Sequence, residues 1–107
     1  MPSVAEVQYA FDTMRNNRVS LYHAAEAELA ARELLKAAEY DADLSGKCDG
    51  KNAEIRAAQK RQATAAEVLA LGKAEAEKRS AQLAYELSAM TVDCIKWQIR
   101  VAQLGAE

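Results

Sequence analysis

A repeat of apolar residues at alternating steps of three and four limits the C-terminal half of the chain to a helical fold. Seven of its positions are Leu83, Leu87, Met90, Cys94, Trp97, Val101 and Leu104. The same register continues back to Ile55, with more polar residues among its members. Such a repeat places one stripe along the face of an α-helix and is typical of helices that pack side by side. It predicts a long helix over about 53–104.

The residue composition favours helices throughout. Alanine occurs 24 times, whereas Val, Ile and Thr together occur 12 times, with four glycines and one proline. Strands favour β-branched and aromatic residues, and the turns between strands use Gly and Pro. Sandwiches, barrels and doubly wound sheets are therefore excluded, and we expect an all-α fold.

The N-terminal part of the chain predicts another helix over about 3–40. Ser3 followed by Glu6 matches a capping box, which places a helix start at this point. Apolar residues then recur at helical spacing. Asn16 and Asn17 interrupt this apolar face and mark the place where the helix would kink.

Residues 41–52 form the strongest break signal between the two predicted helices. Gly46 and Gly50 supply the turn, and Asn52 is a suitable N-cap for the second helix. We therefore expect a single domain over residues 1–107, built as a long antiparallel helical hairpin or coiled coil that associates into a bundle. Gly72 is the position at which the second helix would bend.

The two helices differ in length, which predicts an exposed apolar end. At 1.5 Å per residue they span roughly 57 and 80 Å, so residue 3 would lie opposite about residue 90 and the rest would overhang. A helix broken at Asn16–Asn17 could fold back and cover part of this end. A second stripe beside the first makes the apolar face too wide for one partner helix. We expect a homo-oligomer, or docking onto another protein, through an interface of Leu83, Leu87, Met90, Cys94, Ile95, Trp97, Val101 and Leu104.

The acidic loop offers an alternative, calcium-responsive function. Calcium loops of the EF-hand type place oxygen ligands at fixed positions around a central glycine. Counting from Asp41, the candidate ligands are Asp41, Asp43, Ser45 and Asp49. Position 12, which requires a glutamate, holds Asn52, and there is no second loop to pair with. A polar turn that caps two helices is the preferred interpretation, so we expect no bound metal or other cofactor.

Charge provides a further alternative, nucleic-acid binding. The net charge of −2 gives no overall basic field, but residues 51–80 carry seven basic and four acidic residues. Mixed charge of this kind usually marks a solvated helix face, so nucleic acid is the less favoured partner. The basic residues that would contact phosphates are Arg56, Lys60, Arg61, Lys73, Lys78 and Arg79.

The sequence contains no motif that indicates catalysis, secretion or membrane insertion. His23 is the only histidine, and no nucleophile or ligand set accompanies it. Cys48 and Cys94 form no closely spaced pair, which suggests a reducing compartment. No signal-peptide pattern and no long apolar run occur. We expect a non-enzymatic, cytoplasmic protein that acts through protein–protein interaction.

The segment from Asp49 to Arg56 resembles a turn-helix motif of small helical proteins of unknown function from bacteriophages and prophages. The motif reads D-G-K-N-x-E-x-R and joins two long helices, with the likeness extending over about 60 residues. We expect Gly50 to adopt a positive φ and Asn52 to cap the helix. The resemblance implies a phage or prophage origin and no particular mechanism. For a phage-encoded protein we expect action in the host cytoplasm, with a host or phage protein as a partner.

Overall fold

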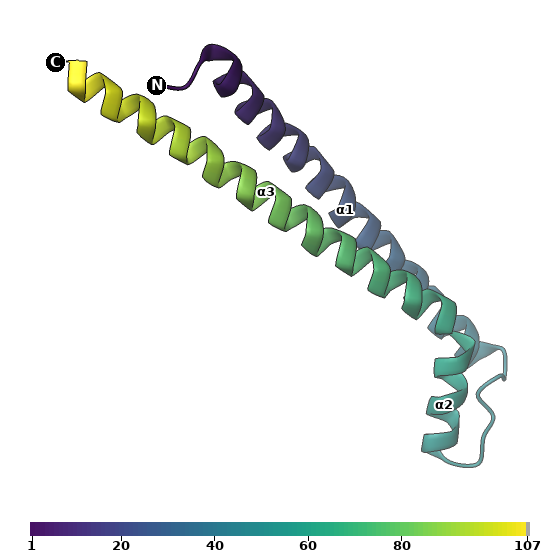
Figure 1. The fold of residues 1–107 in the computed structure, drawn as a ribbon. Coiled ribbons are helices and arrows are strands. Elements are labelled where there is room, and N and C mark those ends of the chain that lie inside the picture. Colours follow the sequence, from purple (N-terminus) through teal and green to yellow (C-terminus); the bar gives the residue numbers. More distant parts are fainter. Residues whose placement is uncertain (107) are drawn as a thin grey trace. The chain divides into compact units, whose positions relative to one another are not determined.

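The computed structural model describes residues 1–106, which form three helices (Figure 1). Helix α1 covers Val4–Leu44, α2 covers Ala53–Ala63 and α3 covers Ala65–Ala106. Residues 1–106 contain no strand. The predicted all-α fold, in which α1 packs against α3 as a hairpin, is confirmed.

The chain divides into two compact units. The first contains Met1–Ala24 and the segment that begins at Lys78, so it joins the N-terminal part of α1 to the C-terminal part of α3. The second, Ala25–Glu77, contains the rest of α1, the turn, α2 and the start of α3. Each unit therefore combines segments that lie far apart in the sequence.

Polar and aromatic contacts fix the antiparallel pairing of α1 and α3 in the first unit. The Asn17 side-chain amide donates a hydrogen bond to the Ala84 carbonyl at 3.1 Å. The Arg18 guanidinium lies 5.5 Å from the centre of the Tyr85 ring. Closer to the N-terminus, the Lys96 ammonium lies 5.9 Å from the centre of the Phe11 ring. Asn17 therefore contributes a contact between helices, and α1 is continuous through Asn16 and Asn17.

A stripe of small and β-branched residues, together with Tyr85, lies on the side of α3 that faces α1 in the first unit. We call it the inner seam. Val92 is 1% exposed, and Ser88 and Ala10 of α1 are also buried. Small side chains at these positions allow the two helix axes to approach closely, because interaxial distance depends on the side chains at the contact. The inner seam follows its own 3–4 spacing and consists of Ala81, Tyr85, Ser88, Val92, Ile95, Ile99 and Ala102, all buried or half-buried.

The predicted overhang of everything beyond residue 90 is wrong. Met1 and Pro2 line one surface depression together with Trp97 and Val101, so the start of α1 lies beside the last turns of α3. The prediction assumed a turn confined to residues 41–52. Instead, α1 continues to Leu44, and the chain forms α2 before α3 begins. This longer connection moves the pairing several residues toward the C-terminus of α3.

The helix predicted over 53–104 is interrupted at Thr64, and Gly72 lies inside α3. Thr64 is 3% exposed, and its hydroxyl donates a hydrogen bond to the Lys60 carbonyl at 2.9 Å. A threonine that bonds back to the preceding turn favours bending of a helix. The helix therefore breaks at a threonine, a residue type that does not predict a break as Gly and Pro do.

The turn before α2 is held by hydrogen bonds to Gly50. Its N–H donates to the Gln59 side-chain oxygen at 2.9 Å, and its carbonyl accepts from the Arg56 guanidinium at 3.1 Å. The expected positive φ is found at Gly46, with φ 75°, and not at Gly50. Gly50 is needed for a different reason, because a Cβ at this position would collide with the Ile55 side chain.

Replacing Asn52 with alanine should lower the stability of α2. The Asn52 side-chain oxygen accepts a hydrogen bond from the Ile55 N–H at 2.9 Å, and this cap satisfies a donor that has no partner within the helix. Loss of such a cap costs about 1 kcal/mol. Urea denaturation followed by circular dichroism measures the change. Asn52→Asp, which keeps the acceptor, should remain close to the wild type, and equal stability of Asn52→Ala would contradict the capping role.

Candidate interface on the outer face of α3

The 3–4 repeat that predicted α3 lies on the solvent face of this helix. We call its part in the first unit the outer seam: Leu83, Leu87, Met90, Cys94, Trp97, Val101 and Leu104. All seven residues are exposed, and the six other than Cys94 retain 52–66% of their accessible surface. Large apolar side chains therefore form a continuous row in water over about six helical turns.

The second apolar stripe was expected beside the first, and this expectation is wrong, because the outer and inner seams occupy nearly opposite sides of one helix. Successive residues on an α-helix are about 100° apart, so Leu87 and Met90 point roughly away from Ser88 and Val92. Burial agrees with this geometry, since Val92 is 1% exposed while Met90, two positions before it, is 66% exposed. Helix α3 thus carries apolar residues on two faces, and α1 covers only one of them.

Ile95 was predicted to belong to the interface, and the structure places it on the inner seam. It is half-buried and lines a depression between the helices together with Tyr9, Ala10 and Ser88. The other seven predicted interface residues are those of the outer seam. Spacing alone could not decide which stripe faces α1. The small residues Ala81, Ser88 and Ala102 on the inner stripe are the signal that distinguishes it, because close helix packing needs them.

One edge of the outer seam is charged and the other is neutral. Arg79, Glu86, Asp93 and Arg100 recur every seven residues along the first edge. Ala84, Thr91, Gln98 and Gly105 follow the second edge. Within residues 1–106, the side chains of Asp93 and Arg100 take part in no ion pair or hydrogen bond. These two charges remain available to a partner.

The predicted calcium ligands are not brought together. Asp41 and Asp43 belong to the last turn of α1, which ends at Leu44, so the loop does not begin at Asp41. Asp43 forms an ion pair with Lys60 at 3.0 Å, and Asp49 accepts a hydrogen bond from Gln59 at 3.1 Å. Among residues 1–106, no group of three or more His, Cys, Asp or Glu side chains is placed to hold a metal ion.

The basic residues of segment 51–80 are partly engaged within the protein. The hydrogen bond to the Asp43 carboxylate raises the pKa of Lys60. Arg56 donates to the Gly50 carbonyl, and Lys78 is half-buried. The ion pair of Lys60 with Asp43 reduces the net positive charge that this segment could offer to phosphates.

The other candidate residues lie apart from one another. His23 is exposed and contacts the neighbouring Tyr22 ring edge-on, at 5.7 Å between ring centres. Cys48 is a half-buried free thiol in the turn. Cys94 is an exposed free thiol on the outer seam, with the Gln98 side-chain nitrogen 3.9 Å from its sulfur.

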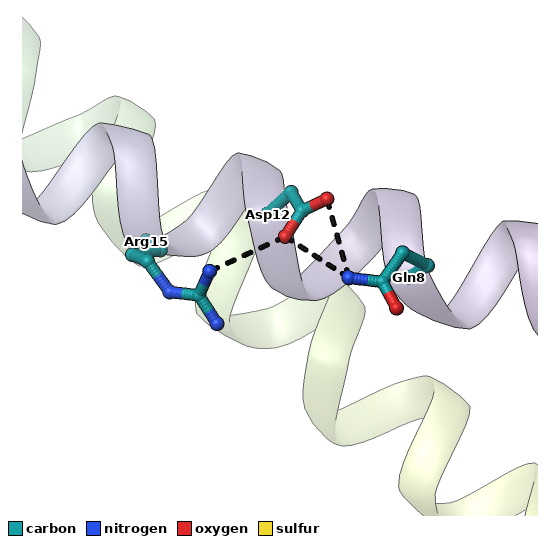
Figure 2. Close-up of polar contacts among 3 residues, drawn as sticks. All are labelled: Gln8, Asp12 and Arg15. Carbon is teal, nitrogen blue, oxygen red and sulfur yellow. Dashed lines mark hydrogen bonds and ion pairs between the residues drawn. The ribbon is translucent and has the colours of Figure 1, made fainter.

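A polar cluster on α1 stabilises the helix surface (Figure 2). The Gln8 side-chain nitrogen donates to both carboxylate oxygens of Asp12, at 3.3 and 3.4 Å, and the Arg15 guanidinium lies 3.5 Å from one of them. Pairs three and four residues apart on an exposed helix contribute about 0.2–0.5 kcal/mol each. These contacts are long and lie on the exposed surface of α1, so their role is to support the helix locally.

Comparison of the chain with known protein families, with curated proteins and with solved structures found no match. Within residues 1–106, no helix combines the length and apolar character that a bilayer crossing requires.

Proposed function

We propose that this protein is a non-enzymatic helical interaction module that self-associates through the outer seam. The single observation that carries the proposal is the row of seven exposed apolar residues on α3, opposite the face that packs on α1. A contiguous apolar surface of this kind normally marks an interface. The phage-like turn motif supports the further proposal of a phage-encoded protein that acts in the host cytoplasm and binds a host or phage protein.

The gain from covering the outer seam is comparable to the cost of association. Full burial of a Leu, Met or Val side chain contributes about 1.5–3 kcal/mol. Because Leu87, Met90 and Leu104 are each more than half exposed, their burial contributes about 1 kcal/mol or more each. A symmetric assembly gains this contribution on both copies. The sum is of the same order as the roughly 4–15 kcal/mol that association costs in lost motion.

The wild-type protein should form a dimer or a larger oligomer at micromolar concentration. Sedimentation velocity over a concentration series measures the mass against the 11.7 kDa of one chain. Trp97 provides a second measurement, because it is the only tryptophan and is 64% exposed in the single chain. Its emission should shift to shorter wavelength as concentration rises. A mass of one chain at every concentration, with unchanged emission, would overturn the proposal.

A further inference from the structure

We propose that two copies pair antiparallel through α3, with Cys94 of each copy opposite Trp97 of the other. This inference rests on the proposed self-association and adds the orientation and register of the helices. In this register Leu87 lies opposite Leu104, and Met90 lies opposite Val101. The partner that covers the outer seam is thus a second copy of the same chain.

The spacing of the outer seam is self-complementary in this arrangement. From Leu87 to Leu104 the steps are three, four, three, four and three residues, which read the same in both directions. A two-fold interface requires that when residue i contacts residue j, residue j also contacts residue i. A two-fold axis that passes midway between Cys94 and Trp97 meets this condition. Because the outer seam points away from α1, a second α3 can approach without displacing that helix.

The charged edge selects the register. With Cys94 opposite Trp97, Asp93 of each copy and Arg100 of the other are offset by about two residues along the helix axis. This gives two opposite-charge pairs along the edges of the interface. Both side chains are exposed and lack an ion pair within residues 1–106. Antiparallel pairing through the outer seam therefore supplies the missing partner of each.

Other arrangements lose this complementarity. Sliding one copy by a heptad toward the N-terminus of α3 places the two Asp93 carboxylates beside each other and sets Ser80 against Leu104. Sliding it the other way places the two Arg100 side chains together. In a parallel pair, the charged edge of one copy faces the neutral edge of the other, at Gln98 and Gly105.

Charge reversal at positions 93 and 100 tests the register. Asp93→Arg and Arg100→Asp should each weaken the dimer about tenfold at low salt, because each replaces two attractive pairs with two repulsive ones. An equimolar mixture of the two variants should form a heterodimer of wild-type affinity, since every opposite-charge pair returns. The double variant should also regain wild-type affinity. Arg79→Asp, on the same edge but beyond the paired region, is the matched control and should leave the affinity unchanged.

Sedimentation of the variants and their mixture, with helicity followed by circular dichroism, separates the two levels of the proposal. If the wild type is a monomer, self-association itself fails and the antiparallel pair fails with it. If the wild type is a dimer, but mixing the two reversed variants restores no affinity, the register proposed here is wrong while self-association stands. Selective heterodimer formation by the mixture supports the antiparallel register.

Discussion

Replacing Leu87 with aspartate should give a folded monomer. Leu87 is 54% exposed on the face of α3 away from α1, so its replacement leaves the packing of the single chain intact. In the dimer the same carboxylate would be buried without a partner. Burying an unpaired charge costs several kcal/mol, and about 3 kcal/mol corresponds to more than a hundredfold loss of affinity. Sedimentation velocity measures the loss, and circular dichroism measures the retained helix.

Two further variants complete this comparison. Trp97→Asp should have the same effect, since Trp97 is 64% exposed on the same seam. Gln103→Asp introduces the same charge at an exposed position of α3 outside both seams, and it should sediment as the wild type does. A Leu87→Asp protein that remains a dimer of wild-type affinity would show that the outer seam is not the interface.

The helices were predictable because their signals are local. The Ser3 cap and the Asn52 cap act within a few residues, and each appears in the structure at its expected position. The Glu6 N–H donates to the Ser3 hydroxyl at 3.1 Å, and the Ile55 N–H donates to Asn52. The 3–4 repeat correctly predicted helix, although the structure divides that helix at Thr64 into α2 and α3. An alanine-rich chain with few turn residues has no competing fold, which is why the all-α prediction is confirmed.

The pairing of the helices was less predictable because it depends on a break without a strong sequence signal. Thr64 ends α2 between two alanines, where the sequence offers neither Gly nor Pro. The connection between α1 and α3 is therefore longer than expected, and the residues beyond 90 lie beside the start of α1. The outer seam is exposed because it lies on the side of α3 that faces away from α1, and not because α3 extends beyond α1 as the helix lengths predicted.

Replacing Val92 with aspartate should unfold the first unit, in contrast to the same change at Leu87. Val92 is 1% exposed on the inner seam, where a carboxylate is cut off from water. Burial of an unsatisfied charge and loss of the apolar contacts together cost about 3–5 kcal/mol. This is comparable to the whole stability of many small domains. Circular dichroism should show reduced helicity and a lower melting temperature.

The two faces of α3 are distinguished by comparing these aspartate variants at one low concentration, at which the wild type is a monomer. Under this condition Leu87→Asp should melt with the wild type, because the interface makes no contribution to a monomer. Val92→Asp should melt well below both, since its defect lies within the single chain. Equal melting of the two variants would contradict the assignment of one seam to the fold and the other to association. Val92→Ala, which removes packing and adds no charge, should fall between Val92→Asp and the wild type.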